Sequence, residues 1–103
     1  MRFEFDPAKS ARNARERGLP FEAAARLFER TRLEWEDRRK EYGEIRYSTL
    51  GEIEGRVFFA SFTRRGEKIR IISFRKANAR ETRRYREYLV GPHQSGAHRL
   101  DEG

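Results

Sequence analysis

Two adjacent segments of this sequence have the pattern of strong β-strands, and only a short turn joins them. Residues 56–63 (RVFFASFT) are rich in aromatic and β-branched side chains, and residues 68–76 (KIRIISFRK) combine isoleucine and phenylalanine with basic residues. Arg65-Gly66 between them is a turn signal. Two weaker strand patterns precede this pair, at residues 32–36 and 45–50. Four consecutive strands with short connections predict an antiparallel meander.

Helical patterns flank the predicted meander. Asp6-Pro7 ends a short strand pattern and begins a helix over residues 7–17, since Asp is a good N-cap and Pro fits the first helical position. A second helix follows Pro20, with apolar residues spaced for one buried face. The last helix covers residues 78–89, where Asn78 and Glu81 have capping-box spacing. The order strand, two helices, four strands, helix predicts an α+β fold in one domain over residues 1–90.

Basic residues concentrate near the end of this domain. The chain has 24 Lys and Arg against 17 Asp and Glu, a net charge of +7, and only four of the bases are Lys. Residues 64–86 hold ten bases and two acids. Because a guanidinium group can grip phosphate with two parallel hydrogen bonds, this segment predicts a polyanionic partner, either nucleic acid or an acidic protein. A solvated charged surface is the alternative.

Several classes of protein are excluded by what the sequence lacks. There is no cysteine, and both histidines lie in the segment 91–103, which we expect to be a mobile tail. Phosphate-binding and dinucleotide-binding glycine motifs are absent. The acids of residues 35–44 alternate with bases, which favours loop charges over a metal site. We therefore expect no metal and no cofactor, and, without a signal peptide or a membrane-spanning stretch, a cytoplasmic protein.

The alternation of side chains along the predicted strand 68–76 indicates which face of the sheet each of its arginines occupies. Neighbouring residues of a strand point to opposite faces, so Arg70 and Arg75 are predicted on opposite faces of the sheet. An unpaired charge beneath a covering helix is strongly unfavourable. We therefore expect at least one of the two to pair with a carboxylate, such as Glu81 or Glu44, or to lie at a rim, and otherwise to be displayed for phosphate.

Metal-free cleavage of RNA suits the residue types that remain. The ribose 2′-OH is an internal nucleophile, so a protein needs to align it, transfer a proton and stabilise the extra negative charge on phosphorus, which arginine does well. A tyrosine or a carboxylate can transfer the proton. Tyr85 and Tyr88 lie in the Arg-rich helix, although their spacing also suits core residues, and Tyr42 and Tyr47 are alternatives.

The order of motifs over residues 3–89 resembles the BrnT-type toxin family of bacterial type II toxin–antitoxin systems. The most specific pieces are DPAK-x-x-x-N near the start and R-I-I-S-x-R-x-A-x-x-x-E-x-x-x-Y, which here runs from Arg70 to Tyr85. The resemblance implies a RelE-like ribonuclease that a cognate DNA-binding antitoxin of the ribbon-helix-helix type neutralises in a hetero-oligomer. Many members have a histidine where this chain has Arg17. If that histidine transfers a proton in the family, the resemblance implies weaker or rearranged catalysis here.

The family pattern and the basic segment together predict the site. The residues assigned to catalysis are Arg64, Arg70, Arg75, Glu81 and Tyr85. The residues assigned to RNA binding are Lys9, Arg12, Lys76, Arg80 and Arg83. The pattern also includes Asp6, Asn13 and Ser73, of which Asp6 has a sufficient role as an N-cap and Ser73 as a packed strand residue.

The leading hypothesis is a metal-independent endoribonuclease toxin that inhibits growth until an antitoxin binds it. A second hypothesis is a non-catalytic module that binds RNA or an antitoxin. A third is a protein-interaction subunit whose arginines neutralise an acidic partner.

Overall fold

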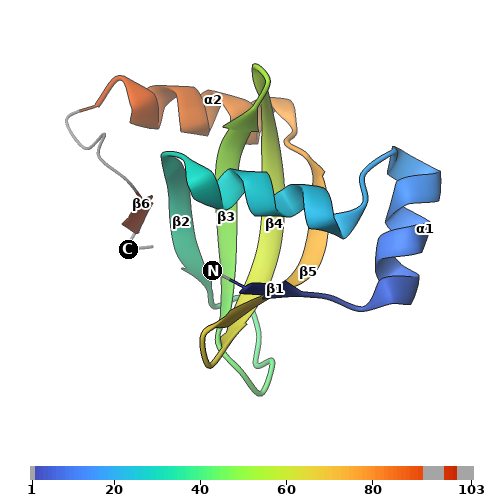
Figure 1. Ribbon diagram of the computed structural model, residues 1–103. Helices are drawn as coiled ribbons and strands as arrows, with labels where there is room; N and C mark the ends of the chain where they lie inside the picture. The colour runs from blue at the N-terminus through green and yellow to red at the C-terminus, as the bar shows by residue number, and fades with distance from the viewer. Residues whose placement is uncertain (1, 92–96, 100–103) are drawn as a thin grey trace.

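A six-stranded mixed sheet forms the centre of the computed structural model, which describes residues 2–91 and 97–99 (Figure 1). The strand order across the sheet is β1-β5-β4-β3-β2-β6. The strands are β1 (Arg2–Glu4), β2 (Arg32–Asp37), β3 (Arg46–Ile53), β4 (Arg56–Arg65), β5 (Lys68–Lys76) and β6 (Ala97–Arg99). Strands β2 to β5 form an antiparallel meander, and β1 and β6 add to its two edges in parallel.

The described residues form three helical segments: α1 (Pro7–Arg17), the 3-10 helix η1 (Phe21–Glu29) and α2 (Ala79–Leu89). The sheet is packed by η1 and α2, and α1 lies to its side, against η1 (Figure 1). The α+β class, the meander and the first helix are confirmed. The second helix is a 3-10 helix, and β6 adds a strand that the predicted order lacks. Residues 92–96 and 100–103 of the predicted mobile tail lie outside the described residues. The RelE-like relationship and the domain limits stay predictions.

Local signals in the sequence fix the helix ends. Asp6 accepts a hydrogen bond from the backbone N–H of Ala8 (2.9 Å), and Gly18 ends α1 at φ 71°, a left-handed conformation that suits glycine. At α2, the Asn78 side chain accepts from the Glu81 N–H (2.8 Å), and the Glu81 carboxylate accepts from the Asn78 N–H (2.9 Å). The predicted capping box is thus confirmed. None of the helices within residues 2–91 has the length and apolar character needed to span a bilayer.

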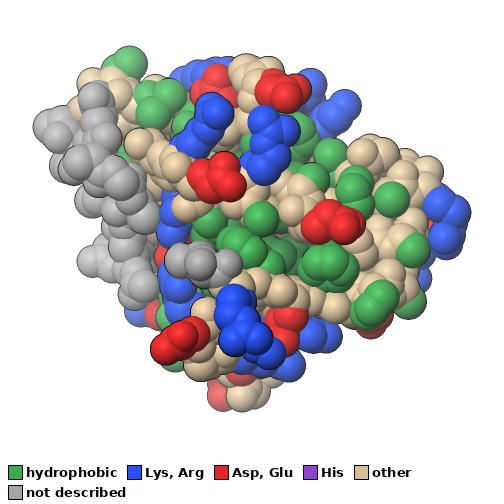
Figure 2. Space-filling model, viewed as in Figure 1, with side chains coloured by type: hydrophobic (Ala, Val, Ile, Leu, Met, Phe, Trp, Pro, Cys, Tyr) green, Lys and Arg blue, Asp and Glu red, His purple; other side chains and the backbone are tan. Residues whose placement is uncertain are grey.

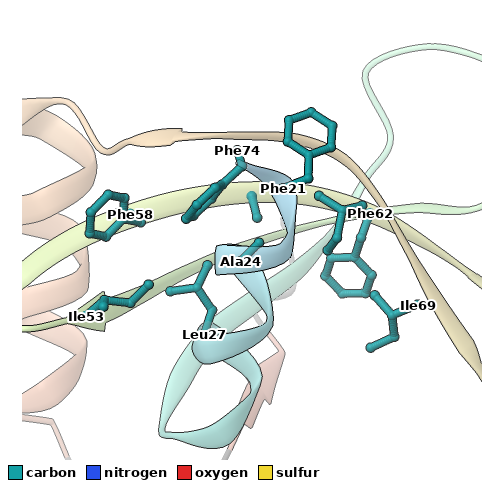
Figure 3. Packing of buried hydrophobic residues seen from close by; sticks show 10 residues of the cluster. Phe21, Ala24, Leu27, Ile53, Phe58, Phe62, Ile69 and Phe74 are labelled. Carbon is teal, nitrogen blue, oxygen red and sulfur yellow. The ribbon is translucent and has the colours of Figure 1, made fainter. Parts of the chain in front are cut away.

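The larger core cluster lies between η1 and one face of the sheet (Figure 3). Phe21 and Leu27 of η1 belong to one cluster with Phe62 and Phe74 of the sheet, and all four side chains are almost fully buried. Gly51 of β3 allows this close approach, because a Cβ atom there would lie 3.0 Å from the Leu27 Cδ2 atom. On this side of the molecule, hydrophobic side chains gather at the centre, between η1 and β1, and charged side chains lie around them (Figure 2).

A smaller cluster lies on the opposite face of the sheet, beneath α2. Tyr85 and Tyr88 of α2 pack there with Leu33, Leu50 and Val57 from three adjacent strands. These strand residues all lie near one end of the sheet. The rest of this face therefore has no helix over it in the part of the chain that the structure describes.

A β-bulge in β5 changes which side chains share that open face. Ser61 pairs with Ser73, but the next residue of β4, Phe62, pairs with Ile71, so Ile72 is left without a partner. Beyond the bulge the alternation is inverted. Arg70 lies opposite Thr63 and Arg75 opposite Phe59, and residues four apart in β4 point to the same face. The prediction that Arg70 and Arg75 lie on opposite faces is therefore wrong.

The first helix is fastened beside the same stretch of β5. The Asn13 side-chain amide donates to the carbonyl oxygens of Leu19 (2.8 Å) and Phe74 (2.9 Å). The Ser10 hydroxyl accepts from the N–H of Phe21 (2.8 Å). Strand β1 pairs only with the first three residues of β5, so Asn13 takes up a carbonyl that the edge strand leaves unpaired.

The contact between η1 and Gly51 predicts a coupled pair of mutations. Gly51→Ala should lower the free energy of unfolding by about 1–3 kcal/mol through overpacking, and Leu27→Ala by about 2–5 kcal/mol by leaving a cavity. In the double variant the added methyl group has room. The double variant should therefore lose less free energy of unfolding than the sum of the two single losses, by on the order of 1 kcal/mol. Urea denaturation of the four proteins measures this, and strictly additive costs would contradict the packing described.

Candidate functional site

A cavity of about 710 Å³ opens on the sheet face that η1 does not cover. It lies between the first turns of α2 and the end of β2. The residues that line it are Trp35, Glu36, Asp37, Arg38, Arg39, Ser48, Phe59, Arg75, Asn78, Arg80, Glu81 and Arg84. Five of these are arginines and three are acids, so the lining combines a net positive charge with two aromatic rings.

Small side chains form the middle of this sheet face. Trp35 of β2 pairs with Ser48 of β3, which pairs with Ser61 of β4, which pairs with Ser73 of β5. The Ser61 and Ser73 hydroxyl oxygens lie 2.6 Å apart. The Trp35 ring lies at one end of this row, and Arg75 lies just past Ser73 at the other end. Because serine side chains fill little volume, there is space between the ring and Arg75.

Arg75 is held in a fixed orientation at the β5 side of the cavity. Its guanidinium carbon lies 4.2 Å from the centre of the Phe59 ring, and its Nη1 and Nη2 atoms donate to the two Glu81 oxygens at 2.9 and 3.0 Å. A guanidinium has five N–H donors in a planar fork. Among the described residues, no hydrogen bond uses the Nε–H, so the edge formed by Nε and Nη2 retains donors for an anion.

Glu81 serves Arg75 and the start of α2 together. Besides binding Arg75, it completes the capping box with Asn78. The hydrogen bond with Arg75 is the main cause that lowers the pKa of Glu81, against a smaller opposing effect of burial. Glu81 is therefore ionised at neutral pH, which suits an anchor for Arg75 better than a proton donor.

Asp37 organises the opposite wall. Its carboxylate accepts from the Nε (2.8 Å) and Nη2 (2.9 Å) atoms of Arg39 and from the Tyr42 hydroxyl (3.0 Å). These hydrogen bonds, led by that of Arg39, outweigh burial and lower the pKa of Asp37 to about 2. The neighbouring Glu36 pairs with Arg38 at 3.3 Å. The acids in this part of the cavity thus have arginine partners.

The third wall consists of Trp35 and the exposed side of α2. The Arg84 guanidinium carbon lies 4.9 Å from the centre of the Trp35 ring. Arg80, one turn earlier on α2, also lines the cavity. Both arginines are exposed.

The structure brings some of the predicted site residues together. Arg75, Glu81 and Arg80 line the cavity. Arg70 lies on the same face but outside the cavity, with its Nη1 atom 3.6 Å from a Glu4 oxygen. Lys9 and Arg12 line a smaller groove of about 150 Å³ between α1 and β5, and Ser73 and Arg75 belong to that groove as well.

Other predicted residues lie elsewhere. Thr63 of β4 lies on the same face as Arg75, so the next residue, Arg64, lies on the η1 face. There it pairs with the buried Glu34 (3.1 Å). Tyr85 is a core residue, 3% exposed, and burial raises the pKa of its hydroxyl. Lys76 and Arg83 are exposed and lie outside the cavity lining. Of the expected pairings, Arg75 with Glu81 is confirmed, and Arg70 pairs with Glu4 in place of Glu44.

Sequence reasoning missed one half of the cavity. Trp35, Asp37, Arg39 and Arg84 received no role, since the acids and bases after residue 35 have the pattern of an ordinary loop. The alternation of Leu33 and Trp35 held a usable signal. It places both side chains on one face, where Leu33 is buried beneath α2 and Trp35 is only partly buried.

Comparison with known families adds an independent finding. The chain matches the family described as the ribonuclease toxin BrnT of type II toxin–antitoxin systems over residues 5–81. This range contains every cavity residue except Arg84. No curated protein matches the chain.

The pairing of Asp37 with Arg39 predicts a pH-dependent stability. Since the pKa of Asp37 is lower in the folded protein than its ordinary value of 3.8, its charge stabilises the fold above pH 4, and this is lost as the pH falls toward 2. Because Arg39 is largely exposed, we expect Asp37→Asn to lower the free energy of unfolding at pH 7 by about 1–2 kcal/mol.

Urea denaturation between pH 7 and pH 2 measures this difference, which should shrink across the acid end of the range. Glu36→Gln is the matched control, because the Arg38 that pairs with Glu36 is mostly exposed, and its effect should be small throughout. An Asp37→Asn difference that stays constant with pH would contradict the described pairing.

Proposed function

Because the chain belongs to the BrnT family of ribonuclease toxins of type II toxin–antitoxin systems, we propose that it is an endoribonuclease that cleaves RNA at the cavity without a metal ion. The observation that carries this proposal is the state of Arg75. Phe59 supports the plane of its guanidinium, Glu81 holds one edge, and the other edge keeps donors in a cavity of net positive charge.

The chemistry uses a nucleophile that RNA itself supplies. The ribose 2′-oxygen attacks the adjacent phosphorus and loses its proton, the bond to the 5′-oxygen breaks, and that oxygen takes up a proton as it leaves. The products are a 2′,3′-cyclic phosphate and a 5′-hydroxyl end. Negative charge increases on the phosphoryl oxygens in the transition state, and a guanidinium already fixed in place stabilises this charge without reorganising. Arg75 is the residue we assign to that role.

Basic side chains on either side of Arg75 provide a path for the RNA backbone. Arg70 lies further along the same sheet face, about 14 Å from Arg75 by the rise of a strand, and Lys9 and Arg12 border the adjoining groove. On the α2 side, Arg80 and Arg84 add two more arginines to the cavity lining. Contacts of this kind set the position of the backbone and make binding sensitive to salt.

A type II toxin family implies an antitoxin protein as partner. We propose that this partner is a ribbon-helix-helix protein and that its binding suppresses the cleavage. Expression of the chain alone should then arrest growth, and co-expression of that antitoxin should restore it.

Two single variants test the assignment of Arg75. Arg75→Ala should lower the rate of RNA cleavage by about 10²- to 10³-fold, as expected for loss of one transition-state donor. Arg64→Ala is the matched control. It removes an arginine from the η1 face, and Arg32 still pairs with Glu34 at 3.0 Å, so cleavage should stay within a few fold of the parent. Thermal unfolding of each variant verifies that the fold is intact.

The same assay tests the chemistry when it is run in excess EDTA and with a substrate that has a single 2′-deoxy nucleotide at the cleaved position. Cleavage should persist in EDTA and stop at the deoxy position. Equal rates for Arg75→Ala and the parent would overturn the site, and loss of activity in EDTA would overturn the metal-free route. Intact RNA with salt-sensitive binding would identify a non-catalytic module instead.

A further inference from the structure

Trp35 has a position that the proposed cleavage chemistry does not require. It is the only tryptophan of the chain, and it lines the cavity from β2, opposite Arg75. Part of its ring packs against the cluster beneath α2, which fixes its orientation, while the side chain stays partly exposed. Its neighbour across the sheet is Ser48, whose small side chain leaves space beside the indole.

The group that lies over the Trp35 ring is replaceable. Arg84 covers the ring at 4.9 Å, and Arg84 itself is exposed on α2. An exposed cation–π contact of this type is weak, whereas a nucleobase stacked on an aromatic side chain is held more strongly. A base that enters the cavity can therefore take the place of the guanidinium over the ring.

We propose that Trp35 is the platform on which an unpaired base of the RNA stacks, in the place over the ring that the Arg84 guanidinium occupies in this structure. This inference rests on the proposed function and deepens it, because it specifies single-stranded RNA as the substrate class. Trp35 and Arg75 line one cavity, about three strand spacings apart, or roughly 14 Å. An RNA strand with a phosphate at Arg75 thus brings a nearby base to the indole, and a base within a duplex cannot unstack without losing its pairing.

The fluorescence of Trp35 provides a direct readout, since no other tryptophan contributes. A single-stranded 2′-O-methyl oligonucleotide, which cannot be cleaved, should quench this fluorescence as it binds. Its duplex with the complementary strand should quench much less. An oligonucleotide of the same length made of abasic sites has the same phosphates and no bases, so it should bind through the arginines with little quenching.

Variants separate the roles of the two residues by anisotropy of a labelled 2′-O-methyl strand. Trp35→Ala should weaken binding by about 10- to 100-fold, and Trp35→Phe, which keeps a ring, by only a few fold. Arg84→Gln removes the cation that covers the Trp35 ring, so quenching by the single strand should be retained. Arg86→Gln is the matched control, because Arg86 is also exposed on α2 but pairs with Glu52 and does not line the cavity.

Several outcomes would overturn the stacking site. These are equal quenching by the abasic strand, equal quenching by the duplex, and unchanged binding by Trp35→Ala. The first two use the parent protein, so they do not depend on whether a variant folds. Cleavage of unmodified RNA is measured separately. Cleavage without quenching would refute only the stacking site, and quenching without cleavage would refute only the ribonuclease.

Discussion

The bulge at Ile72 is the feature on which the arrangement of the candidate site depends. In a regular strand, Arg70 and Arg75 would point to opposite faces of the sheet, and one of them would meet the apolar underside of η1. The unpaired Ile72 inverts the alternation between them, so that Arg70, Ser73 and Arg75 share the face that η1 leaves open. The same shift directs Phe74 into the large core cluster, where it is almost fully buried. One extra residue thus places Phe74 in the core and Arg70 and Arg75 of β5 on the same open face.

The two faces of the sheet differ in packing and in charge. On one face, Gly51 lets η1 approach closely and the surface is apolar at its centre, which does not suit a polyanion (Figure 2). On the other face, α2 covers only the end of the sheet where Leu33, Leu50 and Val57 lie. The serine row and the paired arginines occupy the remainder. Electrostatics and packing therefore favour the same location for RNA, at the open face between α2 and β2.

The sequence allowed the fold to be predicted far better than the site. Capping residues and alternation placed α1, the meander and α2 correctly, because these signals act locally. The faces of β5 were predicted wrongly, since a bulge follows from the pairing of two strands and has no signature in the segment Ile71-Ile72-Ser73 alone. Arg64 lies on the face opposite the cavity, which the sequence did not reveal because net charge along a segment does not tell which face a residue occupies. The position of Trp35 in the cavity lining was missed because it depends on how far α2 extends over the sheet.

The most direct test of this account is the position of bound RNA on the sheet. Amide chemical shifts of the folded protein, recorded by NMR during titration with a single-stranded 2′-O-methyl oligonucleotide, report that position residue by residue. The account predicts the largest changes around Trp35, Ser48, Ser73 and Arg75 and along the first turns of α2, with η1 unaffected. Changes centred on η1 and around Arg64, with the cavity residues unmoved, would contradict it.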